Sequence, residues 1–540
     1  MRTNILKLSF MALAATVFMT GCSQDEDLTN GVNQNNILTV SATVQNFIPD
    51  AATRVTDVAN GTGYETKFEE NDQIGVYAIT DDGTVMCKNM PMTYTSTGTW
   101  TSTSPLYFYK NATYIAYSPY NATVSTLSIT QDNAITEITN YFMNTVLTDG
   151  TKTYKDCDLM TASATTAEAL PEAGASAITF NFAHAMSMVE FVIPVKNYKT
   201  TSGYEYSGPI FGLNLEKQEG VAAKASIAKL ALGKGVYRSL LAPVAAGVED
   251  KDVTFSGEFY VGDGTQPVYF STSTAFKPTA GSFKKVSVTY TNAPDPTDIE
   301  TRDIAVGDYY YADGGIVPGT ETTIPSRDCI GIVYSTDMTG TDTGKSNGYV
   351  IALNDAEKEN GEKNLWFNGD GLDYFSSYTA VDATMMADLK GFTAKNNLEV
   401  AGKLTTTFEA CAAAVGIGVK PVACPDNTTG WYLPTLAQLL TAFTNLAGTS
   451  IDLPNYTGGD VTMDRDVLLA PFIKADGNAD FPIAGSDVSF FWTCSVNSVD
   501  NKIWTLQFNY KGNNKKFYSS QFQTTKMNNR NLHVRPVLAF

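Results

Sequence analysis

The clearest pattern in the first part of the chain is an alternation of apolar and polar residues. In residues 37–45 every second side chain is apolar: Leu38, Val40, Ala42 and Val44. A period of two predicts a strand with one buried face. Similar short apolar or aromatic runs, separated by Gly, Asp or Pro, follow at 73–79, 92–95, 99–101, 107–109, 114–117, 178–182, 186–192 and 284–290. They predict successive strands and an all-β arrangement.

The pattern changes in the last third of the chain. Residues 436–446 place apolar side chains at helical spacing, and Thr435 with Gln438 fits a capping box at the start. Residues 408–415 are rich in Ala and are followed by Gly416, which predicts a second helix that ends there. We therefore expect an α+β unit after a mainly β region.

Changes in composition divide the chain into parts. An apolar run after Arg2 and Lys7 predicts a signal peptide, and an Asn-rich polar stretch predicts a tether. Residues 163–174 and the Pro-containing stretch 291–298 predict junctions. The expected parts are residues 1–21 (signal peptide), 22–36 (tether), 37–165 and 166–292 (two β-sandwich domains), 293–302 (linker) and 303–540 (α+β domain).

The signal peptide ends at a cysteine. The sequence MTGC at 19–22 resembles a bacterial lipobox, and this resemblance implies cleavage before Cys22 and lipidation of its thiol. The acidic stretch at 23–27 resembles a tag that sends lipoproteins to the outer surface. The apolar run is too short to span a bilayer comfortably. We expect a precursor anchored by lipid in the outer membrane at the cell surface; the alternative is an ordinary secreted protein with an unmodified cysteine.

Charge and cysteine content narrow the candidate chemistry. The 540-residue chain has a formal net charge of −19, which argues against nucleic-acid binding. No metal-binding spacing appears, so we expect no metal and no cofactor. Six cysteines remain besides Cys22, at irregular spacings. Cys411 and Cys424 flank a turn and form a candidate disulfide, although the sequence does not fix the connectivity.

Few individual residues suggest a binding or catalytic site. His184 could be catalytic or metal-binding, but without a nearby partner it is more typical of a hydrogen-bonded core histidine. Trp431 is expected in the core, whereas Trp366 lies beside Asn and Gly and is the candidate for stacking on a ligand. No hydrolase elbow, P-loop or dinucleotide motif appears, so we assign no catalytic residue and do not expect an enzyme.

Four segments in the first 292 residues resemble the fimbrillin-like pilins. They are FEENDQIGVY at 68–77, YIAYSPY at 114–120, ITFNFAHAMSMVEF at 178–191 and FKPTAG at 276–281. The resemblance covers about residues 37–292 and implies two tandem β-sandwich pilin domains. It also implies a lipoprotein precursor of a type V surface fimbrium.

The last third resembles C-type-lectin-like domains related to the formylglycine-generating-enzyme fold. The matching segments are GDYYYADG at 307–314, GWYLPT at 430–435, FWTCS at 491–495 and VRPV at 534–537. The calcium-dependent sugar motif of true C-type lectins is not present, and Cys494 lacks the nearby second cysteine of the generating enzymes. The resemblance therefore implies a fold and not an activity.

The fimbrillin-like resemblance implies assembly by strand exchange. It places a protease cut after Arg54, before Val55, which would remove the first strand and let a strand of another pilin subunit take its place. Members of the family donate a strand from an extension after the second sandwich, and here a folded domain follows instead. We therefore predict a tip adhesin of a fimbrium, whose C-terminal domain meets a host glycan, a host protein or another bacterium. The alternatives are a surface-anchored binding lipoprotein that does not polymerise and, less favoured, a surface enzyme.

Overall fold

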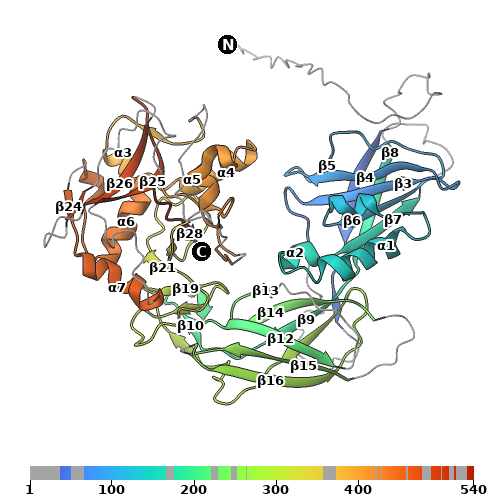
Figure 1. Cartoon of the computed structure of the whole chain (residues 1–540), viewed down its shortest axis with the longest axis horizontal. Helices are drawn as coiled ribbons and strands as arrows, with labels where there is room; N and C mark the ends of the chain where they lie inside the picture. Colours follow the sequence, from blue (N-terminus) through green and yellow to red (C-terminus); the bar gives the residue numbers. More distant parts are fainter. Residues whose placement is uncertain are drawn as a thin grey trace, which may run out of the picture.

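The computed structural model shows a mainly β chain. The residues that it describes are 37–49, 66–165, 176–219, 229–244, 252–262, 264–356, 372–419, 422–425, 427–457, 460–476, 488–499, 502–509, 516–518 and 532–540. Strands predominate over helices in these ranges, which confirms the predicted fold class. None of the helices in these ranges is long and apolar enough to cross a membrane. The chain forms three units, arranged as Figure 1 shows.

The first unit is built on one seven-stranded sheet with the order β1-β8-β7-β6-β3-β4-β5. Its strands are β1 (Leu38–Val44), β3 (Gln73–Ile79), β4 (Val85–Tyr94), β5 (Trp100–Thr101), β6 (Thr113–Ser118), β7 (Met160–Thr165) and β8 (Ser176–His184). In β1, Leu38 and Val40 are buried, whereas Thr39 and Ser41 are exposed. The half-buried strand that the alternation predicted is therefore confirmed.

Helices, and not a second sheet, cover one face of this sheet in the described part of the unit. They are η2 (Ala122–Thr126), α1 (Ala134–Tyr141), the π-helical turn η3 (Phe142–Val146) and α2 (Tyr154–Cys157). Ile138 and Phe142 pack with Tyr77 and Tyr117 of the sheet. The helices form because apolar residues four apart in 134–142 make a short helical stripe. On the other face, β1 and β8 pack with β4 and β5 in one core cluster, so the sheet curls over on itself.

The boundary between the first two units also differs from the prediction. A boundary between residues 165 and 166 would place β8 in the second unit, but β8 pairs with β1 on one side and β7 on the other. Ile178 and Phe180 of β8 are buried in the same core cluster as Ile74 and Val76. The first unit therefore extends to the end of β8, because the alternating apolar face of this strand completes its core.

In the second unit two sheets face each other. A five-stranded sheet has the order β13-β14-β9-β17-β2 and a three-stranded sheet the order β12-β15-β16. The strands are β2 (Ile48–Pro49), β9 (Ser187–Val192), β12 (Phe211–Glu219), β13 (Leu230–Ala231), β14 (Val236–Leu241), β15 (Asp252–Tyr260), β16 (Pro267–Ala275) and β17 (Ser282–Ser287). Phe191 and Phe255 meet between the sheets with ring centroids 5.5 Å apart.

The C-terminal unit contains two five-stranded sheets, with the orders β20-β19-β21-β22-β28 and β23-β25-β26-β27-β24. The first sheet consists of β19 (Tyr309–Tyr311), β20 (Ile316–Val317), β21 (Cys329–Ser335), β22 (Tyr349–Ala352) and β28 (Val537–Ala539). The second consists of β23 (Ser377–Tyr378), β24 (Asp460–Thr462), β25 (Val488–Asn497), β26 (Lys502–Asn509) and β27 (Lys516–Tyr518).

Helix α6 connects these two sheets. The helices of the unit are α3 (Ala383–Met386), α4 (Gly391–Val400), η4 (Thr406–Phe408), α5 (Glu409–Ala414), α6 (Leu436–Leu446), η5 (Leu453–Asn455) and α7 (Arg465–Asp476). Helix α6 contacts β21 of one sheet and β25 and β26 of the other. The predicted bounds of α6 and its capping box of Thr435 and Gln438 are confirmed.

The C-terminal unit is fastened to the second unit by a buried carboxylate. Asp313 Oδ2 accepts hydrogen bonds from Ile210 N at 2.7 Å and from the Tyr237 hydroxyl at 3.0 Å. Its other oxygen accepts from Gly315 N at 2.9 Å. Burial raises the pKa of Asp313, and the three hydrogen bonds oppose that rise. This contact fixes the C-terminal unit on the second unit.

A small sheet adds to this junction. It has the order β11-β10-β18 and consists of β10 (Asn197–Lys199), β11 (Glu205–Ser207) and β18 (Ile299–Thr301). Strand β18 falls within the predicted linker 293–302 and runs parallel to β10. The linker is therefore partly a strand of the junction.

The first prediction concerns this junction. Asp313→Ala should lower the free energy of unfolding of the joined second and C-terminal units by about 3 kcal/mol. The buried donors Ile210 N and the Tyr237 hydroxyl would lose their acceptor. Urea unfolding followed by tryptophan fluorescence would measure it. Asp295→Ala is the matched control, because Asp295 is exposed and accepts only from Thr297 within the linker. Equal midpoints for the two variants would contradict the structural role of Asp313.

Candidate functional site

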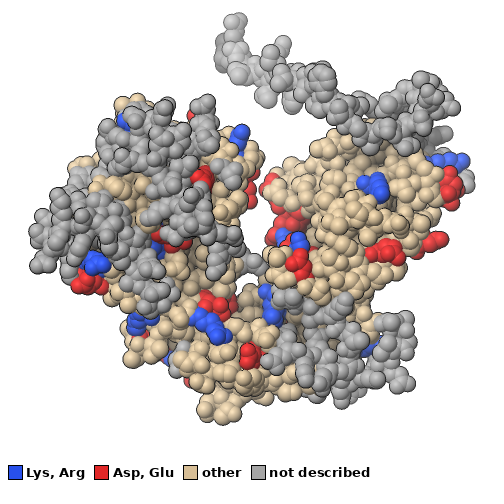
Figure 2. All heavy atoms as spheres, in the orientation of Figure 1, with Lys and Arg blue, Asp and Glu red and all other residues tan. Residues whose placement is uncertain are grey.

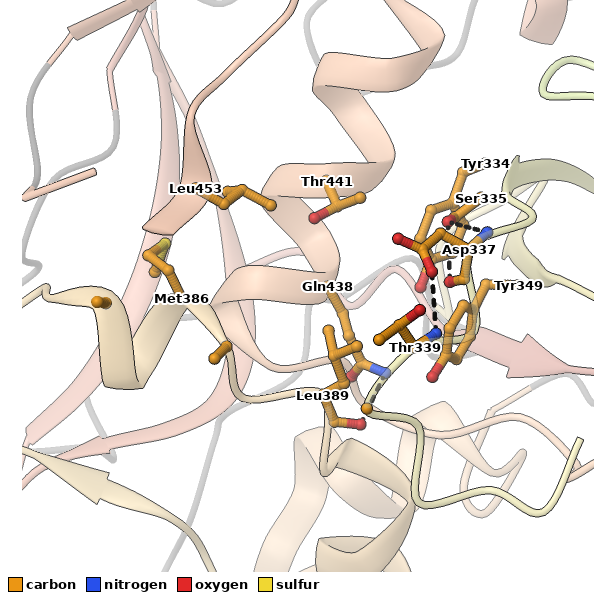
Figure 3. A pocket seen from close by; sticks show the side chains of 13 residues that line it. Tyr334, Ser335, Asp337, Thr339, Tyr349, Met386, Leu389, Gln438, Thr441 and Leu453 are labelled. Carbon is orange, nitrogen blue, oxygen red and sulfur yellow. Dashed lines mark hydrogen bonds between the residues drawn. The ribbon is translucent and has the colours of Figure 1, made fainter. Parts of the chain in front are cut away.

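A cavity of about 430 Å³ opens beside α6 in the C-terminal unit. Four separate segments form it: the end of β21 with the following loop, the start of β22, the α3 region and the exposed side of α6 with η5. In Figure 3, Tyr334, Asp337 and Tyr349 lie on one side, and Met386 and Leu453 lie opposite them across α6. Such a volume is within the range of small-ligand pockets.

The loop after β21 forms a polar side. Asp337 is exposed, and its Oδ1 accepts a hydrogen bond from Thr339 N at 2.9 Å. Asp337 N donates to Ser335 Oγ at 3.1 Å. Hydrogen bonds from Thr339, its backbone N–H first, lower the pKa of Asp337. The carboxylate is therefore charged at neutral pH, and Figure 3 shows it pointing from its loop toward α6.

Two tyrosines lie behind this loop. The Tyr349 hydroxyl donates to Thr341 Oγ1 at 2.7 Å. The Tyr334 hydroxyl is buried and has no hydrogen-bond partner among the residues that the structure describes. Burial raises the pKa of both phenols, that of Tyr334 well above its usual value. Both phenols are therefore protonated at neutral pH, and the hydroxyl of Tyr334 donates to no acceptor among the described residues.

The base of the cavity is held rigidly by Gln438. Its Nε2 donates to Leu389 O and to the Tyr432 hydroxyl, both at 3.1 Å, while its Oε1 accepts from Thr435 N at 3.1 Å. Thr441 follows one turn later on the same face of α6. Its hydroxyl donates to Ala437 O at 2.7 Å and keeps its acceptor positions.

The opposite side of the cavity is aliphatic. Met386, Leu389 and Leu453 line it, together with Ala383 and Ala387. Among the described residues that line the cavity, Asp337 is the one that carries a charge, and none is a lysine or arginine. Figure 2 shows the same sparseness more widely, with charged side chains scattered over a mostly uncharged face. The cavity is therefore amphipathic and weakly acidic.

A second functional feature is the N-terminal segment (residues 37–49), which completes the edges of two sheets. Strand β1 lies at the edge of the first sheet and pairs in parallel with β8 from Leu38↔Ser176 to Val44↔Phe182. The next element, β2, lies at the edge of the second unit's sheet and pairs with β17. Four residues after β1, the chain thus changes from one unit to the other.

Phe47 anchors this segment between the two edges. It is buried, and its ring stacks on the imidazole of His184 with centroids 3.7 Å apart. His184 Nδ1 lies 2.8 Å from Asp158 Oδ1, and its Nε2 lies 3.1 Å from Thr66 Oγ1. The interpretation of His184 as a hydrogen-bonded core histidine is confirmed.

The residues predicted as sites lie outside the described part of the chain. These are Cys22, Arg54, Val55 and Trp366. Trp431, predicted as core, is buried and donates from its indole to Ala423 O at 3.1 Å. Within the described ranges, no group of three or more His, Cys, Asp or Glu side chains could hold a metal ion.

The predicted disulfide is wrong. The six described cysteines form no disulfide with one another: Cys87, Cys157, Cys329, Cys411, Cys424 and Cys494. Cys411 packs with Cys494 and Leu433 in one core cluster, whereas Cys424 lies against a different cluster around Trp431. Although Cys411 and Cys424 flank the same turn in the sequence, their thiols do not meet in the structure. Burial raises the pKa of Cys494 well above its usual value, which disfavours the thiolate.

Sequence reasoning missed the cavity residues. Tyr334, Asp337, Tyr349 and Leu453 belong to separate segments, and no local motif marks them as a group. Gln438 was identified only as a helix cap. The one available signal is the Asp-x-Thr spacing of Asp337 and Thr339, which predicts a turn and not a site.

Comparisons with known proteins agree with the fimbrial interpretation. Residues 53–308 match the family model described as "Fimbrillin-like". A curated relative, "Putative fimbrium tip subunit Fim1C" of Bacteroides ovatus, is 26% identical over 500 residues, which cover 80% of this chain and 86% of that protein.

Solved structures of similar proteins have low overall superposition scores. A fimbrial protein from Bacteroides ovatus has a TM-score of 0.40 and 19% identity, covering 94% of this chain and all of that chain (100%). A "putative cell adhesion protein" from Bacteroides uniformis has a TM-score of 0.26 and 16% identity, covering 47% of this chain and 96% of that chain. Residues 53–308 are therefore similar to the fimbrillin-like family, and the chain is similar to a fimbrial subunit.

Proposed function

We propose that this chain is the tip subunit of a fimbrium, exported as a lipoprotein and carrying a C-terminal recognition domain at residues 303–540. The observation that carries the proposal is the position of the N-terminal segment. It lies upstream of Arg54 and completes the edge of the first sheet through β1 and that of the second unit through β2. A cut after Arg54 would separate this segment from the rest of the chain.

Loss of the segment would leave two edges in need of a partner. Leu38 and Val40 of β1 are buried in the first core, and Phe47 is buried at His184. Each fully buried apolar side chain contributes about 1.5–3 kcal/mol. An open strand edge above an empty apolar groove readily accepts a strand from another chain. A neighbouring pilin subunit would supply that strand.

The other end of the pilin region supports a terminal position. Residues after β17 do not form a free extension, because β18 pairs with β10. Arg302 binds Asp308 through two hydrogen bonds of 2.9 and 2.7 Å. A segment held in this way cannot leave to fill a neighbour's groove without breaking the junction. The subunit would receive a strand and donate none, and the similarity to a fimbrium tip subunit supports the same place.

The C-terminal unit is then the adhesive head. Its sequence resembles C-type-lectin-like domains, and its cavity beside α6 presents hydroxyl, carboxylate and aliphatic groups together. An enzyme is less well supported, because the thiol of Cys494 is buried with a raised pKa. The target at the host surface or on another bacterium would meet this unit first.

The tip role predicts where the C-terminal unit lies on a fibre. Immunogold labelling with antibodies against residues 303–540 should give one cluster at fibre ends, because a subunit that donates no strand stops growth. Antibodies against a shaft subunit provide the comparison. Labelling along the whole shaft would overturn the tip role, and labelling only on the cell body would favour a surface lipoprotein that does not polymerise.

The maturation site gives a separate prediction. Arg54→Ala should keep the N-terminal segment attached and abolish incorporation into fibres, because β1 and β2 would continue to fill both edges. N-terminal sequencing of assembled subunits should give Val55 for the wild type. Lys88→Ala is the control, since Lys88 is an exposed cation on β4, away from the cut. Assembled fibres that begin at Cys22 would refute this route.

The lipoprotein step is tested at Cys22. Cells supplied with a palmitate analogue should label the wild-type precursor and not the Cys22→Ala variant, because the thiol carries the lipid. Cys424→Ala removes a partly exposed thiol of the C-terminal unit and should leave the labelling unchanged. Equal labelling of the wild type and Cys22→Ala would show that Cys22 is not the attachment point.

A further inference from the structure

We propose that the cavity beside α6 binds the end of an uncharged glycan. This inference rests on the proposed role of the C-terminal unit as a recognition domain, and it names the class of ligand. Two properties of the cavity select that class: its charge and its two-sided lining.

The charge of the lining disfavours an anion. In the described part of the chain, Asp337 is the one charged residue that lines the cavity, and no lysine or arginine lines it. A sialic acid, a sulfate or a phosphate would bring a negative charge beside this carboxylate without a cation to offset it. Anions in proteins are normally held by Arg, Lys or backbone N–H groups. The ligand is therefore neutral where it enters the cavity.

The two-sided lining fits a sugar ring. One side offers Met386, Leu389 and Leu453, and the other offers Asp337, Thr339 and Ser335. Thr441 lies between them on α6, as Figure 3 shows. A pyranose presents C–H groups on one face and hydroxyls around its edge, so both sides of the cavity are matched. A carboxylate accepts hydrogen bonds from two neighbouring hydroxyls at once.

A purely apolar ligand would match only half of the cavity. An aliphatic side chain of a peptide would cover Met386 and Leu453 but would remove water from Asp337 and Thr441 without replacing its hydrogen bonds. Burying such groups without partners is costly.

The rigid base favours selective binding. All polar atoms of the Gln438 amide are engaged by Leu389, Tyr432 and Thr435. The helix that carries it is held between two sheets. The cavity shape is thus fixed before a ligand arrives, which reduces the entropy cost of binding.

A glycan array and variants test the proposal. The full-length protein, purified in mild detergent, is applied to neutral oligosaccharides and to their sialylated and sulfated counterparts. We expect binding to at least one neutral glycan and weaker binding to its charged counterparts. Asp337→Asn and Thr441→Val should each weaken that binding about tenfold or more, because each removes hydrogen bonds to the ligand.

A matched control is available within the chain. Asp149 is a partly exposed aspartate whose Oδ1 accepts from the backbone N–H two residues later, that of Thr151, but it lies in the first unit. Asp149→Asn should bind as the wild type does. Circular dichroism of all variants checks that each remains folded, and a second variant, Leu453→Ala, tests the aliphatic side independently.

The pH dependence follows from the carboxylate. Because hydrogen bonds from Thr339 lower the pKa of Asp337 below its usual 3.8, Asp337 stays charged on acidification. Binding should therefore be constant between about pH 7 and pH 5 and decline only near or below about pH 4. A loss of binding centred near about pH 6 would assign it to another group.

Two results would overturn the proposal: preference for sialylated or sulfated glycans, or neutral-glycan binding that Asp337→Asn, Thr441→Val and Leu453→Ala all leave unchanged. An array with no bound neutral glycan would also overturn it. The two experiments distinguish failure of the tip role from failure of the glycan proposal. Clusters at fibre ends without neutral-glycan binding would keep the tip role and remove this inference, and shaft labelling with glycan binding would do the reverse.

Discussion

The edge of β8 that β1 closes is the constraint on which the first unit depends. The strand is buried on its alternating face through Ile178 and Phe180, yet one of its edges is closed only by β1. An open edge of this kind exposes backbone groups and favours association with other chains. Strand β1 precedes the rest of the first sheet by a long stretch of sequence and takes no part in the pairs from β8 to β5. The same short segment also closes the edge of β17, so one segment completes sheets in two units.

Phe47 explains why the segment behaves as one element. It lies between β1 and β2 and fills a buried place against His184, whose nitrogens are engaged by Asp158 and Thr66. The hydrogen-bonded imidazole gives the phenyl ring a flat and fixed surface. Phe47 thus packs in one core cluster with residues of both units, among them Ile115 and Met188.

Much of the fold follows from local pattern, and the errors have identifiable causes. The alternation in β1 and the stripe and cap of α6 predicted their elements correctly, because each pattern is complete within a few residues. The helices of the first unit were not predicted, because the helical stripe at 134–142 is short and lies among Thr and Asn. The place of β8 could not be predicted, since pairing between distant strands depends on which core its apolar face completes.

The cavity could not be predicted either, because the residues that line it are far apart in the sequence. Its polar and aliphatic sides come from β21, α3, α6 and η5, which only the packing of α6 between two sheets brings together. The predicted disulfide was wrong for the opposite reason: Cys411 and Cys424 are close in sequence but pack in different clusters.

The packing of α6 also separates what must stay fixed from what can vary. Gln438 and Tyr432 belong to the buried interior, so changing them would disturb the capping box and the core. Asp337, Thr339 and Gly340 lie on an exposed loop that contributes little to the core. Loops held on a rigid scaffold tolerate substitution while keeping their position. Recognition by this unit can therefore change at the rim while the junction through Asp313 and the sheets below it remain the same.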